Sequence, residues 1–292
     1  MSHIEQEIAD QPNAWRLAVE AADREVEKLP VFGSRVAFVG CGTSLYMSQA
    51  IAALRESAGD GESDAFPASE FPSGRRYDLI VAISRSGTTT EVVRLLEAVD
   101  GTPTLAVTAV NRTPVVSEAS RTIVLDFADE ESVVQTRFAT SALALFRSHL
   151  GESLDVAIAD AERMVTAELP VDPTAFEQFV FLGTGWRAGI ANEAALKMRE
   201  ATGTWAESYP AMEYRHGPIS VATDRTCVWV FGEVEASLLD QVRETGASVV
   251  NEPEVDSMAH LILAQRSAVA LAEARGLDPD KPRNLTRSVV LS

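Results

Sequence analysis

A pattern of apolar run, glycine turn and helix occurs twice in the chain, and it limits the possible folds more than any other feature. The two copies read VAFVGCGTS over residues 36–44 and FVFLGTGWRAGI over residues 179–190. A continuous apolar run that ends in glycine is typical of a strand buried on both faces of a parallel sheet. The recurrence predicts an internal duplication of one strand–turn–helix unit.

Strand and helix patterns alternate through the rest of the chain. Two helices separated near Pro12 are expected over residues 4–29. Further buried strands are predicted at residues 77–84, 102–109, 121–127, 227–232 and 247–250, and further helices at residues 45–57, 92–98, 187–200, 235–244 and 257–275. This alternation predicts an α/β protein whose parallel sheets are covered by helices on both faces.

The domain boundaries follow from the positions of prolines and of the repeated pattern. The segment LPVDPTAF, which follows a helix expected to end near Glu168, carries Pro170 and Pro173 and separates the two copies. We expect N-terminal helices over 1–30, a first domain over 31–168, a second over 169–275 and a tail over 276–292.

Charge and composition argue against several classes of partner. The 43 acidic residues exceed the 25 basic ones by 18, so the chain lacks the basic surface that nucleic acid requires. No apolar run approaches the ~20 residues of a membrane span, and the polar N-terminus lacks the features of a secretory signal. Cys41 and Cys227 have neither zinc-ligand nor disulfide-framework spacing. We therefore expect a cytoplasmic protein with no nucleic-acid, membrane or metal partner.

The segment Ser84-Arg-Ser-Gly-Thr-Thr89 stands between a predicted strand and a predicted helix. Backbone N–H groups and hydroxyls in that position can surround an anion at the positive end of the helix. The alternative is a cluster of Ser and Thr that only caps the first turn. A second loop, Cys41-Gly-Thr-Ser44, has the same placement, so both should open at the carboxyl edge of one sheet, where α/β folds bind ligands. Neither loop has the dinucleotide-binding or P-loop pattern.

Titratable residues cluster in the second half of the chain. Glu193, Lys197 and Glu200 are spaced four and three apart and share one helical face, where a surface ion pair is the simplest alternative. A loop bounded by Gly and Pro is expected to follow, and it carries Glu207, Tyr209, Glu213 and His216. A histidine and a carboxylate could divide ring opening and proton transfer between them.

Four motifs in this order resemble the sugar isomerase (SIS) domain family, most closely the isomerase half of glucosamine-6-phosphate synthase. They are CGTS, SRSGTT, EAALKMRE with HGP, and DPDKPRNLTRSV, and they cover most of the chain. The resemblance implies two flavodoxin-like SIS lobes, a phosphorylated hexose or hexosamine as substrate, and a homodimer with its sites at the subunit interface. It implies no cofactor.

The resemblance also assigns roles to individual residues. Glu200 falls on the enolisation base, Lys197 on a sugar-contacting lysine, and His216 on a ring-opening histidine that comes from the neighbouring subunit. Thr43 would line the sugar. The remaining candidates for substrate and phosphate binding are Ser44, Ser84, Arg85, Ser86 and Thr89.

Three features depart from the synthase. The chain starts Met1-Ser2-His3, and its first cysteine is Cys41 inside the CGTS loop, so glutamine hydrolysis in cis is not expected. Arg287 stands where the synthase has an imine-forming lysine, and a guanidinium cannot form that imine at neutral pH. Arg137 likewise stands in a region where the synthase has a lysine.

These features together predict an isomerase or isomerising deaminase of an amino-hexose 6-phosphate, for example one that converts glucosamine 6-phosphate to fructose 6-phosphate and ammonia. Phosphosugar isomerisation without an amine and fructosamine-phosphate deglycation are the enzymatic alternatives. A non-catalytic phosphosugar-sensing module is the alternative from another class.

Overall fold

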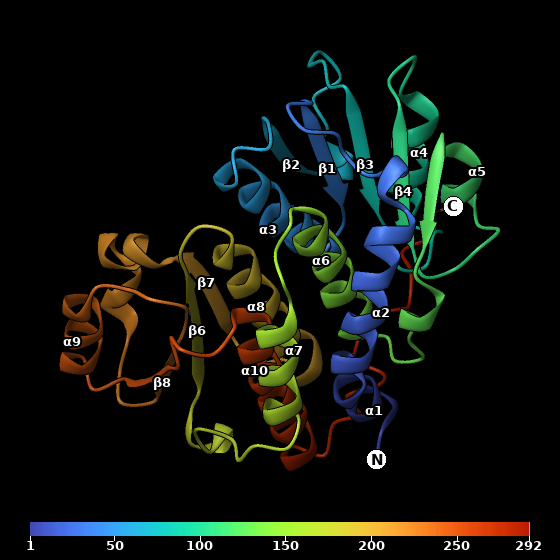
Figure 1. Ribbon diagram of the computed structural model, residues 1–292. Helices are drawn as coiled ribbons and strands as arrows, with labels where there is room; N and C mark the ends of the chain where they lie inside the picture. The colour runs from blue at the N-terminus through green and yellow to red at the C-terminus, as the bar shows by residue number, and fades with distance from the viewer. Residues whose placement is uncertain (292) are drawn as a thin grey trace. The chain divides into compact units, whose positions relative to one another are not determined.

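The computed structural model describes residues 1–291 and divides into two compact units. The first unit comprises residues 10–131, 135–154 and the C-terminal residues from Thr286. The second unit comprises residues 1–9, 132–134 and 155–285. Each unit contains one parallel sheet with helices on both of its faces (Figure 1).

The first unit is built on a five-stranded parallel sheet with the order β2-β1-β3-β4-β5. Its strands are β1 (Val36–Gly40), β2 (Ser63–Pro67), β3 (Leu79–Ile83), β4 (Thr104–Thr108) and β5 (Arg121–Val124). The order reverses at β1, which pairs with β2 on one side and β3 on the other. Such a switch point places the loops after β1 and β3 where open α/β sheets bind ligands.

Five helices surround this sheet: α2 (Gln11–Arg24), α3 (Thr43–Ser57), α4 (Thr90–Ala98), α5 (Pro114–Glu118) and α6 (Arg137–His149). The α4 and α5 helices cover one face, where Val92 and Val115 join a core with Ala37 and Ile80. On the other face, the Phe38 ring meets Phe146 of α6 edge to face, with 5.4 Å between ring centroids. Burial of these apolar side chains is the main term that holds the layers together.

The second unit contains a four-stranded parallel sheet with the order β7-β6-β8-β9. Its strands are β6 (Gln178–Gly183), β7 (Ala206–Pro210), β8 (Thr226–Phe231) and β9 (Ser248–Asn251). This order repeats that of β2-β1-β3-β4 in the first unit. The repeat in the sequence therefore corresponds to a repeat in topology.

The helices of the second unit are α1 (His3–Ala9), α7 (Asp155–Met164), α8 (Arg187–Thr202), α9 (Ala236–Glu244) and α10 (Ser257–Ala274). Leu238 and Val242 of α9 pack on one face of the sheet. On the other face, the Trp229 indole of β8 donates a 2.9 Å hydrogen bond to Nε2 of His260 on α10. Burial lowers the pKa of His260 to about 3, so this imidazole is neutral.

Glycine ends the first strand of each unit for a steric reason. A Cβ on Gly40 would lie 2.7 Å from the carbonyl carbon of Ser44, and one on Gly183 would lie 2.2 Å from the carbonyl oxygen of Arg187. The helix that follows each strand thus starts against the strand's last residue. Only glycine fits that close approach, and this accounts for the repeated motif.

The predicted α/β class, with two parallel sheets and two leading helices, is confirmed. Two details of the expectation are wrong. The helix expected to end near Glu168 ends at Met164. The segment expected to be a loop around Glu207 and Tyr209 forms the edge strand β7, followed by the 3-10 helix Ala211–His216. Because β7 is paired on one side only and half-buried, its sequence AESYP lacks the apolar run that marks the inner strands. No helix within residues 1–291 is both long and apolar enough to cross a membrane.

Candidate active site

The SRSGTT loop connects β3 to α4 at the carboxyl edge of the first sheet. Ser84 is buried, and its Oγ lies 3.5 Å from Oγ1 of Thr89. Ser86 Oγ accepts the Thr88 backbone N–H at 3.2 Å and so stabilises the turn. Gly87 has φ +64°, and a Cβ there would lie 2.1 Å from Thr113 Oγ1. The loop therefore presents several hydroxyls and a helix N-terminus with no bulky side chain between them, which suits an anion.

The CGTS loop lies beside it, because β1 and β3 are neighbours in the sheet. Thr43 and Ser44 are the first two residues of α3, and both are buried. Gly42 before them has φ +54° and provides no side-chain cap. The structure thus brings both predicted hydroxyl loops to one edge of one sheet, and we call the six residues Thr43, Ser44, Ser84, Arg85, Ser86 and Thr89 the hydroxyl cradle.

Arg85 differs from the other members of the cradle because its buried side chain is charged. Its Nη2 donates to the backbone oxygen of Arg287 at 2.9 Å, and its Nη1 lies 3.9 Å from a carboxylate oxygen of Glu130. Glu130 is buried too, and it accepts the backbone N–H groups of Thr136 and Arg137 at 2.6 and 2.7 Å. This carboxylate therefore caps the start of α6 and places a negative charge beside Arg85.

The C-terminal tail contacts the cradle through hydroxyl and backbone groups. Ser288 Oγ lies 3.1 Å from Ser86 Oγ and 2.9 Å from Thr88 Oγ1. The Thr90 backbone N–H, in the first turn of α4, donates to the Val289 carbonyl at 3.1 Å. The tail thus uses the same kinds of donor that would bind a phosphate.

Arg287 holds the tail by a contact that the sequence did not indicate. Its guanidinium donates to the Asp129 carboxylate and to the Glu130 carbonyl. Arg137, the second arginine expected to replace a lysine, donates to Asp10 Oδ2 at 2.7 Å and to the Asp129 carbonyl. Both arginines therefore serve as anchors around residues 129–130.

The predicted carboxylate–lysine cluster lies on α8 in the second unit. Lys197 Nζ lies 2.5 Å from Glu200 Oε2 and 3.4 Å from Glu193 Oε1. The Lys197 and Glu193 side chains are at most 2% exposed, whereas that of Glu200 is 18% exposed. Glu200 is the member of the cluster that a ligand can reach, and the ammonium supports its negative charge near the C-terminal end of the helix.

His216 ends the 3-10 helix Ala211–His216 and is exposed. No hydrogen bond or ion pair joins its imidazole to any other side chain among residues 1–291, and it makes no such contact with the Lys197–Glu200 pair. Three large apolar side chains on the same stretch of chain are also exposed: Trp205 (73%), Met212 (38%) and Val221 (56%).

Comparison with family models matches one segment of the first unit. Residues 33–148 match the family model described as SIS domain. This segment is an SIS domain. It includes the whole hydroxyl cradle and the Glu130 cap described above.

The sequence relatives of the SIS-containing chain are larger proteins. This chain is 27% identical to the isomerizing glutamine–fructose-6-phosphate aminotransferase of Methanothermobacter thermautotrophicus, over 98% of this chain and 57% of the relative. It is 28% identical to the enzyme of the same name from Halobacterium salinarum, over 98% of this chain and 58% of the relative. The chain therefore spans less than two thirds of the length of these relatives.

Solved structures match nearly the whole chain. A glucosamine-6-phosphate deaminase from Thermotoga maritima aligns with a TM-score of 0.84 and 27% identity, covering 99% of this chain and all of that one. A tagatose-6-phosphate ketose/aldose isomerase from Escherichia coli aligns with a TM-score of 0.82 at 20% identity, covering 100% and 96%. The second likeness shows a shared fold.

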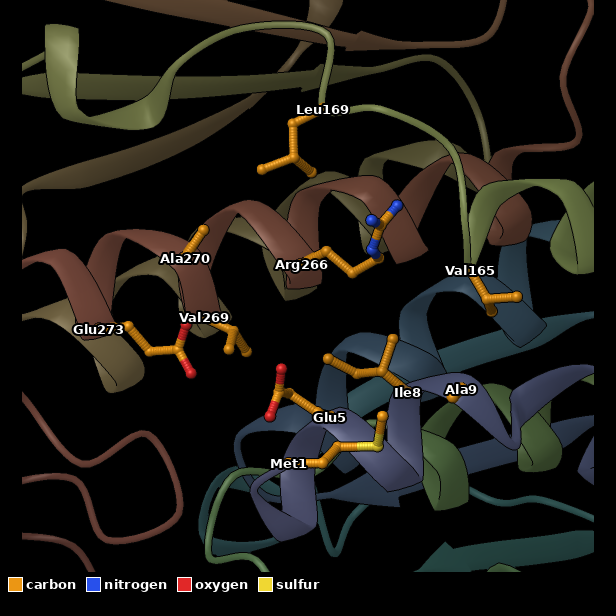
Figure 2. Close-up of a pocket in the computed structure, with 10 residues that line it drawn as sticks. All are labelled: Met1, Glu5, Ile8, Ala9, Val165, Leu169, Arg266, Val269, Ala270 and Glu273. Carbon is orange, nitrogen blue, oxygen red and sulfur yellow. The ribbon is translucent and has the colours of Figure 1, made fainter.

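Two cavities in the second unit differ in what they contain. One, of about 270 Å³, lies between α1 and α10 and holds none of the predicted site residues. Figure 2 shows Glu5 and Glu273 on its sides, and the Arg266 guanidinium donates to the Met164 and Ala167 carbonyls, both at 2.7 Å. The other cavity, of about 750 Å³, has Glu200 in its lining. Among residues 1–291, no cluster of three His, Cys, Asp or Glu side chains could hold a metal ion.

Proposed function

We propose that this SIS-containing chain is an isomerising deaminase of an amino-hexose 6-phosphate, with glucosamine 6-phosphate as the model substrate. The observation that carries the proposal is the Lys197–Glu200 pair, in which the more exposed partner lines a cavity large enough for a sugar. The structural likeness to a protein named glucosamine-6-phosphate deaminase supports the choice of an amino sugar.

The hydroxyl cradle would bind the phosphate of the substrate. Ser84, Ser86 and Thr89 offer hydroxyl donors at the positive end of the α4 helix dipole. The Arg85 side chain is already engaged with Glu130 and the Arg287 carbonyl, so we assign to it the support of the loop. Because the phosphate is bound at a distance from the reacting carbons, its binding energy can be used to orient those carbons.

Glu200 would carry the proton between the two reacting carbons. In the open-chain aldose, its carboxylate removes the proton from C2, and the electron pair forms an enolamine with C1. Return of the proton to C1 leaves an imine at C2. Water then adds to C2 and ammonia leaves, which gives the ketose phosphate. One carboxylate near both carbons is sufficient for this transfer.

Lys197 and His216 would assist this proton transfer. The ammonium of Lys197 lies 2.5 Å from Glu200, so it can orient the carboxylate and hydrogen-bond a sugar hydroxyl. His216 would open the sugar ring by protonating the ring oxygen. We propose that His216 acts in the site of a second copy, because it is exposed on a stretch of chain that also exposes Trp205, Met212 and Val221. A homodimer would cover these apolar side chains.

A panel of hexosamine 6-phosphates tests the proposal directly. The protein is incubated with glucosamine, galactosamine and fructosamine 6-phosphates and with fructose 6-phosphate, and ammonia, ketose and aldose are measured. We expect equal amounts of ammonia and ketose from one of the first two, and loss of both in Glu200→Gln. The matched control is Glu244→Gln, which neutralises an exposed carboxylate of α9. Isomerisation of fructose 6-phosphate without ammonia release from any amino sugar would refute the deaminase proposal.

A further inference from the structure

The cavity of about 270 Å³ between α1 and α10, here called the α1–α10 cavity, lies within the second unit and shares no lining residue with the Glu200 cavity. Most of its walls are apolar, and they include Ile8, Val165, Leu169, Val269 and Ala270. Its volume is just below the ~300–1,000 Å³ of sites for drug-sized ligands, so the cavity suits a smaller molecule.

Arg266 carries the positive charge of this cavity, and it has no anionic partner. Its two hydrogen bonds, to the Met164 and Ala167 carbonyls, both come from Nη1, so Nη2 and Nε remain for a ligand. Burial lowers the pKa of this guanidinium, and within residues 1–291 no carboxylate forms an ion pair with it. A ligand carboxylate would supply the missing negative charge and could accept two N–H groups.

Glu5 and Glu273 make another part of the cavity anionic. Glu5 Oε2 accepts the Ser2 backbone N–H at 2.6 Å and the Ser2 hydroxyl at 3.0 Å, and neither carboxylate forms an ion pair among residues 1–291. In Figure 2 the two carboxylates turn towards each other, and the Arg266 guanidinium turns away from both. Like charges that face each other repel, so a ligand ammonium between them would be stabilised by both.

The spacing of these charges limits the shape of the ligand. Arg266 and Glu273 lie seven residues apart on one face of α10, which is two turns or ~10.5 Å along the helix axis. Val269 and Ala270 line the cavity between them. A ligand that meets both charges needs its own charges at opposite ends of an apolar chain. An α-amino acid carries both charges on one carbon and cannot reach both ends.

The two helices that form the cavity are hydrogen-bonded to the surroundings of the Glu200 cavity. The backbone N–H groups of His3 and Ile4, at the start of α1, donate to the Asp280 carboxylate at 2.9 and 2.7 Å. Residues 281–284, which follow Asp280, line the Glu200 cavity. Arg275, directly after α10, also lines it and donates to Thr204 Oγ1 at 2.5 Å. A ligand that fixes α1 against α10 therefore also restrains this lining.

We infer that the α1–α10 cavity is an effector site for a small linear molecule that has a carboxylate at one end, an ammonium at the other and an aliphatic chain between them. The carboxylate binds Arg266, the ammonium lies between Glu5 and Glu273, and the chain packs on the apolar wall. No covalent bond changes. The inference goes beyond the proposed function and does not rest on the role of Glu200.

Calorimetric binding of four related compounds tests the site. The probe is 6-aminohexanoate; 2-aminohexanoate has the same atoms with the ammonium beside the carboxylate, and hexanoate and hexylamine each lack one charge. We expect the probe to bind at least tenfold more tightly than each of the other three. Arg266→Gln and Glu273→Gln should each remove this preference, and Glu273→Gln, which changes an exposed side chain, should bind hexanoate no more weakly than the wild type. Glu244→Gln, on α9 outside the cavity, is the matched control.

Amide hydrogen exchange tests the effector role. With the probe bound, exchange in residues 278–284 should slow, and unchanged exchange there would overturn that role. Equal binding of the four compounds, or equal probe binding by the wild type and Glu273→Gln, would overturn the site. Probe binding that is lost in Glu200→Gln and kept in Glu273→Gln would place the ligand in the Glu200 cavity and would also overturn the inference. These measurements need no turnover, so a failure of the proposed function leaves their outcome unchanged.

Discussion

Ser288 in the tail offers a test of how the hydroxyl cradle is used. Its Oγ lies 3.1 Å from Ser86 Oγ and 2.9 Å from Thr88 Oγ1, so a phosphate that binds these hydroxyls must displace it. Each neutral hydrogen bond contributes about 0.5–1.5 kcal/mol net, because water replaces it when it is broken. The other tail contacts, from Arg287 to Asp129 and from Thr90 to Val289, remain in a Ser288→Ala variant.

We therefore expect Ser288→Ala to favour phosphate binding by about 1 kcal/mol, which corresponds to roughly fivefold tighter binding. The assay is a calorimetric titration with glucosamine 6-phosphate, repeated with inorganic phosphate to isolate the cradle. Val290→Ala is the control, because it truncates a tail side chain that is 69% exposed. Weaker binding by Ser288→Ala would show that the hydroxyl is a ligand of the phosphate, and would refute the competition between tail and substrate.

Three further predictions concern the cradle, the dimer and the core. Removing three cradle hydroxyls should weaken phosphosugar binding at least a hundredfold by calorimetry, since charge-assisted hydrogen bonds contribute ~1.5–3 kcal/mol each; the variant is Ser84→Ala, Ser86→Ala and Thr89→Ala. His216→Asn and Glu200→Gln, each nearly inactive alone, should recover roughly a quarter of wild-type activity after subunit exchange, because half of the dimers then hold one intact site. Burial lowers the pKa of His260 to about 3. Below pH ~6.5 this imidazole therefore takes up a proton in the unfolded chain but not in the folded one, so the free energy of unfolding falls as the pH decreases towards 3. Between pH 7.5 and pH 5, the free energy of unfolding measured with urea should decrease by about 2 kcal/mol in the wild type, and this decrease should be absent in His260→Gln. An equal decrease in both proteins would contradict a buried, neutral imidazole.

The inner strands and the hydroxyl loops could be predicted because their signals are local. Each inner strand is a run of apolar residues, and Gly40 and Gly183 mark the point where helix meets strand. The spacing of Lys197 and Glu200 follows from helix geometry alone, and the structure shows the contact at 2.5 Å. Local patterns of this kind need no knowledge of the rest of the chain.

The edge strands and the supporting contacts could not be predicted in this way. The β2 and β7 strands, with sequences SDAFP and AESYP, are half-buried and lack an apolar run. Glu130 and Arg287 are 157 residues apart, and the sequence signals neither their contact nor the one between Ser86 and Ser288. The two segments that line the Glu200 cavity, the end of α8 and the residues after α10, are likewise brought together only by the fold. Long-range pairing of this kind depends on topology.

The central claim is that Glu200 moves the proton, and deuterium exchange measures that step itself. The protein is incubated with glucosamine 6-phosphate in deuterated water, and label at C1 and C2 is followed by NMR for the wild type and for Glu200→Gln. The amide keeps the shape of the carboxylate but cannot accept the proton, so we expect the variant to bind the sugar and to exchange about 10²–10⁴ times more slowly. Exchange at the wild-type rate in Glu200→Gln would contradict the account.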